Sequence, residues 1–251
     1  MEFASNLERI EQQANALRAA AVAAGPAAAV PTCPDWTVHR LVRHIARVHN
    51  MVRGALDTEP SVRMPPAEQP PEDWAELLAW WDQQLKAMLG DLRAKGPDVP
   101  CWVFGITDDV ALARSGFWAR RQAHETAIHR LDAEHAHAGS AEPGAVPSLV
   151  FDPELAADGI DEALVLMVPR KLARERPDAE GTVLFHAADA GRAWLVRLVP
   201  GEIPQVGPAD EVATDASVVG TADAVYRAAW HRPTTAIVNG DRALVDVLRT
   251  P

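Results

Sequence analysis

Apolar residues recur every three or four positions along four long segments in the first half of the chain. These segments are residues 5–24, 37–56, 72–95 and 116–137. Such spacing places the apolar side chains on one face of a helix, which then packs against its neighbours. Ser5 and Glu8 form a capping box at the start of the first segment, and the proline-rich residues 58–71 separate the second from the third. Four amphipathic helices joined by loops predict a four-helix bundle.

The pattern changes after Gly139. Residues 140–153 are rich in Gly, Pro, Ser and Ala, which is typical of a linker. Beyond them we predict a helix at 156–174 that Pro169 kinks or ends, strands at 182–186 and 193–199 joined by a DAGR turn, a possible strand at 215–220, a helix at 222–230, a short strand at 236–238 and a last helix at 242–248. The predicted fold class is therefore α + α/β with two domains: a four-helix bundle at residues 1–145 and a small α/β domain at residues 151–251.

The composition excludes several classes of partner. The net charge of −11 argues against nucleic acid and anionic membrane surfaces, because both require a concentrated basic face. No apolar run is long enough for a transmembrane helix, and the acidic, amphipathic start lacks the features of a secretory signal. Cys33 and Cys101 are too few for a disulfide framework. We therefore expect a cytoplasmic protein. We expect it to be either a monomer or a homodimer.

Glu125 and His129 are the residues most indicative of chemistry. Their i,i+4 spacing in the fourth predicted helix places both side chains on one face, one turn apart, where they could hold a divalent ion. The alternative is a solvated pair on the helix surface. A third ligand would have to come from the second predicted helix, which carries His39, His44 and His49, because the third contains no histidine. Periodicity does not choose among the three.

Tryptophans and cysteines are more often core residues than functional ones. We expect Trp36, Trp74, Trp81 and Trp118 in the core because they lie at helix starts or on apolar stripes, whereas Trp102, in the loop before the fourth helix, could line an entrance to the site. Neither cysteine has a His or Lys neighbour that would activate it, so we interpret both as small buried hydrophobic residues.

Two segments of the predicted bundle resemble the mycothiol-dependent maleylpyruvate isomerase family. They are TCPDWTVHRLVRHIARVHNMV at residues 32–52 and GFWARRQAHETAIHRLDAE at residues 116–134. LAADGIDEALV at 155–165 and VNGDRALVDVL at 238–248 resemble the family's C-terminal domain, which is related to sterol-carrier proteins. The resemblance covers nearly the whole chain. It implies that the N-terminal domain is a DinB-like, metal-binding four-helix bundle.

The resemblance also assigns roles to individual residues. It implies that His44 is the ligand from the second helix and that Glu125 and His129 complete the metal triad. Arg121 and Asp132 of the same block would then orient the ligands, or they form a salt bridge on the helix surface. In the C-terminal domain, Arg232 of AWHRP is the candidate catalytic cation for an anionic substrate or thiol, although arginines near helix ends also bind exposed carbonyls.

Two imidazoles and one carboxylate leave several positions of a divalent ion open. Zinc is the expected ion, and nickel, iron or cobalt would also fit. Coordination deprotonates a thiol, and the thiolate attacks an activated alkene or a similar small electrophile. The family implies mycothiol as that thiol and an isomerase or S-transferase as the function. We expect the ligand pocket in the crevice between the two domains, because domain interfaces are preferred places for small-molecule sites. The alternative is a non-catalytic metal- or small-ligand-binding protein of the same fold, but a structural zinc site would normally close with a fourth ligand.

Overall fold

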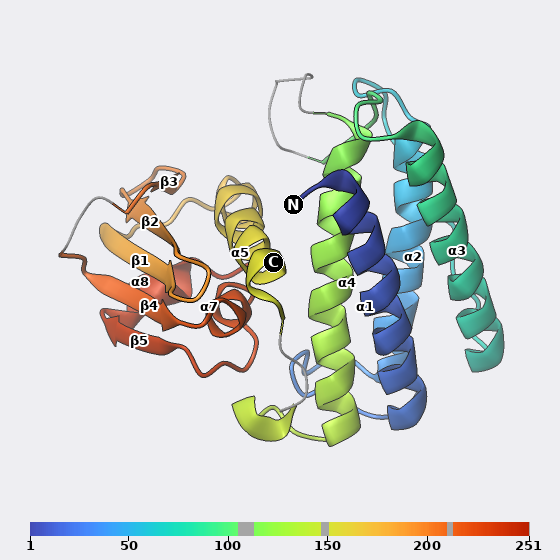
Figure 1. Ribbon diagram of the computed structural model, residues 1–251, viewed down its shortest axis with the longest axis horizontal. Coiled ribbons are helices and arrows are strands. Elements are labelled where there is room, and N and C mark those ends of the chain that lie inside the picture. The colour runs from blue at the N-terminus through green and yellow to red at the C-terminus, as the bar shows by residue number, and fades with distance from the viewer. Residues whose placement is uncertain (105–112, 147–150, 210–212, 251) are drawn as a thin grey trace. The chain divides into compact units, whose positions relative to one another are not determined.

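The computed structural model describes residues 1–104, 113–146, 151–209 and 213–250. The chain divides into two compact units, Met1–Ala141 and Glu142–Pro251. The first unit contains four long helices and the second a five-stranded sheet with helices (Figure 1), so the predicted fold class is confirmed. None of the helices within the described ranges has the length and apolarity needed to cross a membrane. That residues 1–145 and 151–251 are the two domains stays a prediction.

Four helices build the first unit, at nearly the predicted positions. They are α1 (Phe3–Ala24), α2 (Val38–Leu56), α3 (Trp74–Lys95) and α4 (Ser115–Ala138). Thr37 caps α2 by accepting a hydrogen bond from the Arg40 amide, and Asp73 caps α3 through two backbone amides. Such caps fix where a helix begins because they satisfy amides that lack an intrahelical partner.

The capping box predicted at Ser5 and Glu8 is wrong. α1 begins at Phe3, so Ser5 lies inside the helix, and Glu2 stands at the N-cap without a side-chain hydrogen bond. Phe3 packs against the core cluster that contains Leu7 and Ile10. This apolar contact of the partly buried Phe3 side chain favours a helix that extends upstream of the capping signal, and its contribution is comparable to that of a cap, about 1 kcal/mol.

The helices pack in neighbouring pairs, α1 against α4 and α2 against α3, with α2 also meeting α4 (Figure 1). One apolar cluster includes Leu17, Leu41, Ile45 and Trp81, and a second includes Ile10, Met88 and Trp118. The polar side chains buried between α2 and α4 therefore sit inside a packed bundle. They need partners there, because an unpaired polar group in such surroundings is costly.

The second unit holds a mixed sheet. Its strands are β1 (Gly181–Ala187), β2 (Arg192–Leu198), β3 (Gln205–Gly207), β4 (Ala216–Gly220) and β5 (Ile237–Gly240), in the order β3-β2-β1-β4-β5. The β1–β4 pair is parallel and the others are antiparallel. β3 has only three residues, and the sequence pattern did not predict it. The DAGR turn between β1 and β2 is confirmed.

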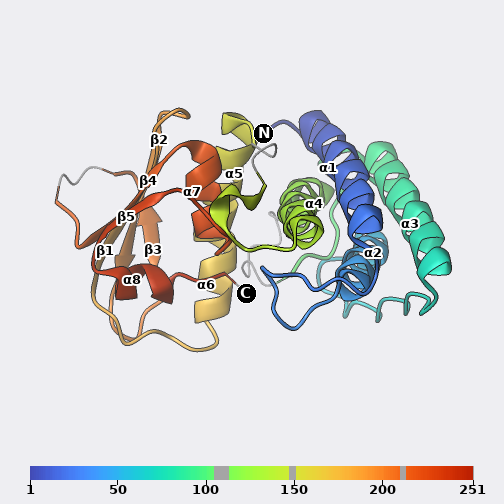
Figure 2. The ribbon, with the colours of Figure 1, turned by 90° about the horizontal axis from the view of Figure 1, so that it is seen from below.

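Helices cover this sheet. α7 (Ala222–Ala229) packs on β1 and β4, α8 (Arg242–Val247) contacts the same strands, and α5 (Pro153–Glu162) packs on α7 (Figure 2). The single helix predicted at residues 156–174 begins earlier and is interrupted: a π-helical segment, Ala163–Met167, follows α5 and leads into α6 (Val168–Leu172). Pro169 lies in the first turn of α6, directly after the π-helical segment, where the regular pattern of backbone hydrogen bonds is already interrupted.

Candidate metal centre

His44, Glu125 and His129 meet between α2 and α4. One ligand atom from each lies within 4.8 Å of the other two. Oε1 of Glu125 is 2.8 Å from Nε2 of His44 and 3.3 Å from Nε2 of His129. The two imidazole rings lie edge to face with their centroids 4.8 Å apart. Both Nε2 atoms thus point towards the same carboxylate oxygen, an arrangement of donor atoms that a single divalent ion could occupy.

Helix geometry explains how distant residues meet here. Glu125 and His129 project from one face of α4 because they are one turn apart. His44 follows the Thr37 cap by about two turns on α2, which contacts α4. Its side chain is 34 % exposed, against 18 % for Glu125 and 10 % for His129. The site therefore has one partly open side, as a centre that admits a substrate requires.

Charged partners keep the buried carboxylate ionised. Burial by itself would raise the pKa of Glu125, but the Arg121 guanidinium and the hydrogen bonds with His129 and His44 outweigh it and hold the pKa well below its ordinary value. For His129, burial would lower the pKa, whereas Asp132 and Glu125 together raise it to about 9. Without an ion, the site therefore holds a carboxylate against an imidazolium.

Arg121 and Asp132 are buried beside the triad, so they are not a salt bridge on the helix surface. Arg121 donates from Nη2 to Oε2 of Glu125, and its side chain is 3 % exposed. The fully buried carboxylate of Asp132 lies 2.9 Å from Nδ1 of His129 through its Oδ2 atom. Each therefore fixes the orientation of one member of the triad, as groups behind metal ligands commonly do.

The other two histidines of α2 have different partners. A ring nitrogen of His39 lies 2.8 Å from the carbonyl oxygen of Glu72. His49 is completely buried, and its Nδ1 accepts a hydrogen bond from Nε1 of Trp81. Within the described ranges, no group of three potential ligands other than His44, Glu125 and His129 comes together. The structure thus brings together the three residues that the family resemblance selected.

The structure adds a contact to one tryptophan prediction and corrects another. Trp36 packs against the core as expected, but its ring also lies 5.0 Å from that of His44 and 5.8 Å from that of His129. Trp36 is therefore a neighbour of the site. Its place in the CPDWT motif is the feature of the sequence that could have indicated this. Trp102, expected at the entrance, stacks on Trp118 at 6.1 Å within the second core cluster. Its position is explained by core packing.

Arg232 lies just after α7 in the second unit. Its Nη1 donates to the carbonyl oxygen of Trp230, which is the helix-end contact considered as the alternative to a catalytic role. The preceding residue, His231, has a positive φ of 53°. A role for Arg232 in substrate binding stays a prediction.

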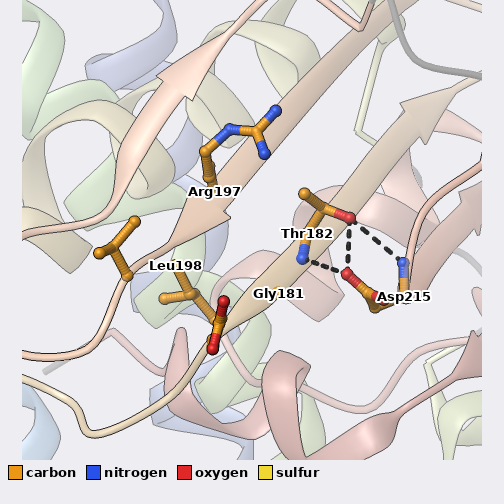
Figure 3. Close-up of a pocket in the computed structure, with 7 residues that line it drawn as sticks. Gly181, Thr182, Arg197, Leu198 and Asp215 are labelled. Carbon is orange, nitrogen blue, oxygen red and sulfur yellow. Dashed lines mark hydrogen bonds between the residues drawn. The ribbon is translucent and has the colours of Figure 1, made fainter.

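The second unit also contains an open polar pocket of about 480 Å³ (Figure 3). Thr182 and Arg197 face each other across β1 and β2, and Asp215 accepts hydrogen bonds from both the amide and the hydroxyl of Thr182. These bonds lower the pKa of Asp215. They join the chain before β4 to the start of β1, so the Asp215 carboxylate already has a structural role.

Comparisons with known proteins identify the family and the fold of the chain. The model of the mycothiol maleylpyruvate isomerase N-terminal domain matches residues 7–134, and that of the MDMPI C-terminal domain matches residues 154–246. No curated protein matches the chain. Crystal structures of the mycothiol-dependent maleylpyruvate isomerase and of a point mutant of it share the fold: TM-scores are 0.60, identities 13% and 12%, and each alignment covers 95% of this chain and 93% of the other. The predicted enzyme class is confirmed, and the chain belongs to the mycothiol maleylpyruvate isomerase family.

Proposed function

We propose that this protein is a metal- and mycothiol-dependent isomerase or S-transferase acting on a small electrophile such as an activated alkene. The observation that carries the proposal is the convergence of His44, Glu125 and His129, whose ligand atoms lie within 4.8 Å of one another. Family membership supports mycothiol as the thiol.

The residues present fit a divalent ion. Two imidazole nitrogens and a carboxylate oxygen are ordinary ligands of zinc, and the carboxylate is ionised. The two Nε2 atoms already approach one oxygen, so small side-chain shifts would bring all three donors to metal distance. When bound, the ion would supply Lewis acidity that lowers the pKa of a thiol and keeps it as the nucleophilic thiolate. Zinc is the proposed ion.

The protein's own residues prepare this site. Asp132 accepts the Nδ1 proton of His129 and so directs Nε2 of that ring towards the triad. Arg121 balances the charge of Glu125 from the side opposite the histidines. The protein would hold the ligands in position before the ion arrives, which reduces the cost of ordering them on binding.

A combined binding and turnover experiment tests the proposal. Purified, tag-free protein should contain or take up one equivalent of Zn²⁺, measured by elemental mass spectrometry and calorimetry. Mycothiol should then bind with release of a proton, because the thiolate is the coordinating form. Turnover of maleylpyruvate, and of a panel of other electrophiles, should require the thiol. Equal turnover without mycothiol would refute the mechanism, whereas binding without any turnover would favour a non-catalytic binding protein.

Arg232 is proposed as the cation that receives an anionic group of the substrate or thiol. Replacing it with Met should raise KM for a carboxylate-bearing electrophile by about tenfold or more, because a charge-assisted hydrogen bond contributes roughly 1.5–3 kcal/mol. An electrophile without a carboxylate serves as the comparison. An equal effect on both substrates would show that Arg232 only bonds the Trp230 carbonyl and does not bind the carboxylate of the substrate.

A further inference from the structure

The turn before α2 contacts the residue that orients His129. Oγ1 of Thr32 donates a hydrogen bond of 2.6 Å to Oδ1 of Asp132, and Sγ of Cys33 lies 3.6 Å from Oδ2 of the same carboxylate. Oδ2 is also the atom that faces Nδ1 of His129 at 2.9 Å. The buried carboxylate is therefore held from one side by residues 32–33 and from the other by the imidazole.

The same turn contacts the triad a second time, through Trp36. Its ring stacks at an interplanar angle of 23° on His129, at 5.8 Å, and is tilted against His44, at 5.0 Å. One aromatic side chain thus touches the imidazoles of both helices. The rotation of each ring is limited by this contact, whereas the i,i+4 geometry of α4 fixes only where its side chain begins.

Backbone hydrogen bonds make the turn rigid. The Cys33 amide donates to the Val30 carbonyl, the Trp36 amide to the Cys33 carbonyl, and the Val30 amide to the Trp36 carbonyl, at 2.8–2.9 Å. Ala29 and Thr37 form an isolated antiparallel bridge, and α2 begins immediately afterwards at Val38. Residues 32–36 are therefore attached directly to the helix that carries His44, while their side chains contact α4.

We propose that residues 32–36 are a positioning element for the metal ligands, with Thr32 and Cys33 fixing Asp132 and Trp36 fixing the His44 and His129 rings. This inference rests on the proposed function, because it assumes that the triad binds an ion. The element touches ligands and their supporting carboxylate, so its residues act through His44 and His129. It would set the affinity of the site and the geometry of the bound ion. Mutation of such supporting groups typically lowers metal affinity 10- to 100-fold.

The hydroxyl of Thr32 provides the sharpest test. Thr32→Val keeps the shape of the side chain and removes the donor to Asp132, so the affinity for Zn²⁺, measured by competition with a chelating dye, should fall 10- to 100-fold. Thr32→Ser restores the donor and should return the affinity to within about threefold of wild type. Thr126→Val is the matched control: it removes a buried hydroxyl from α4 that has no hydrogen-bond partner within the described residues.

The visible absorption spectrum of the Co²⁺-substituted protein gives a readout that a general loss of stability would not change. Thr32→Val should shift the ligand-field bands, because His129 would be less firmly oriented, while Thr126→Val should leave them unchanged. If Thr32→Val matches wild type in both affinity and spectrum, the positioning role is refuted although the metal site stands. If the wild-type protein takes up no ion at all, the proposed function fails and this inference with it.

A tryptophan pair tests the second contact independently and applies even if Thr32→Val folds poorly. Trp36→Leu should lower Zn²⁺ affinity and broaden the Co²⁺ spectrum. Trp74→Leu is its control, because Trp74 packs 6.0 Å from His39, a histidine outside the triad. Equal effects of the two substitutions on metal affinity, with equal losses of thermal stability, would show that Trp36 contributes only general packing.

Discussion

Arg121 and Glu125 form a buried ion pair one turn apart on α4, with Nη2 of the arginine 2.5 Å from Oε2 of the glutamate. The other carboxylate oxygen, Oε1, faces the two histidines. One side chain therefore neutralises Glu125 while leaving the oxygen nearest the imidazoles available. Because both members are buried, the pair has consequences for stability as well as for metal binding.

Removal of Arg121 should destabilise the protein strongly. Arg121→Met leaves the Glu125 carboxylate buried without its guanidinium partner, and breaking a buried pair in this way typically costs about 3–5 kcal/mol. Urea unfolding in the presence of a chelator measures the loss. The double variant Arg121→Met with Glu125→Gln should recover part of it, because no unpaired charge remains. A loss below about 1 kcal/mol for the single variant would contradict the importance of the pair.

Removal of a triad histidine should abolish tight metal binding. His129→Ala leaves two of the three donors, so we expect the affinity for Zn²⁺ to fall by at least 100-fold and thiol-dependent turnover to be lost. His39→Ala is the matched control, since His39 bonds the Glu72 carbonyl and is not part of the group. Calorimetry on both variants provides the measurement. If His129→Ala retained the wild-type affinity for Zn²⁺, the triad would be excluded as the metal site.

The sequence predicts local relationships within α4 far better than contacts between helices. The spacing of Glu125 and His129 suffices to place them together, because helix geometry is regular. His44 could be selected from the family motif but not from the apolar pattern. The hydrogen bond between Thr32 and Asp132 joins residues 100 positions apart in the chain. Such a contact depends on how α1, α2 and α4 pack, and no local pattern encodes it.

The fold class and most elements were predictable for a similar reason. Long amphipathic segments such as α2 have a strong periodic signal, and Thr37 and Asp73 mark helix starts by their chemistry. β3 spans three residues, too few to show an alternation, and it is stabilised by pairing with β2. The π-helical turn at Ala163–Met167 likewise has no sequence pattern of its own.

Acid should destabilise the bundle through His49. Burial, with a smaller contribution from His44 and against the opposing charge of Glu125, lowers the pKa of His49 from 6.5 to about 3. The unfolded chain therefore binds a proton near pH 6.5 that the folded protein cannot bind until about pH 3. The contribution of His49 to the free energy of unfolding is fully present above pH 6.5. It decreases as the pH falls towards about 3, by up to about 1.4 kcal/mol per pH unit.

The pH dependence can be assigned to His49 by substitution. His49→Gln keeps an acceptor for Nε1 of Trp81 and removes the titrating group, so its unfolding free energy, measured with a chelator between pH 7 and 4, should fall less steeply. His137→Gln, at an exposed position near the end of α4, should keep the wild-type slope. Identical slopes for wild type and His49→Gln would contradict the assignment.

Cys101 should be inert to alkylation in the native protein. Burial raises the pKa of its thiol from 9.0 to about 11, despite the nearby positive charge of Lys95. The thiolate fraction near pH 8 is then roughly 100-fold lower than that of an ordinary cysteine, and the side chain is inaccessible as well. Iodoacetamide treatment followed by peptide mass spectrometry should find Cys101 unmodified without urea and modified in urea. Rapid native alkylation would contradict its burial.

The second unit should tolerate no side chain at Gly240. This residue has a φ of 76°, and a Cβ atom there would lie 2.1 Å from the carbonyl oxygen of Asp215. The backbone fixes both the Cβ atom and the carbonyl oxygen, so side-chain rotation cannot relieve the clash. A backbone shift would disturb the pairing of Gly240 with Ala216 in the β4–β5 ladder. Gly240→Ala should therefore cost more than about 3 kcal/mol, combining backbone strain with displacement of a strand.

Gly191 provides the matched control for this prediction. It lies in the turn between β1 and β2 with a φ of 61°, and a Cβ atom there would meet nothing within 4 Å. Gly191→Ala should cost only the strain of a left-handed alanine, about 1–2 kcal/mol. Hydrogen–deuterium exchange of peptides spanning β4 and β5 measures both losses, and Gly240→Ala should expose these strands far more. Similar exchange in the two variants would show that β5 can move away from Asp215 at little cost.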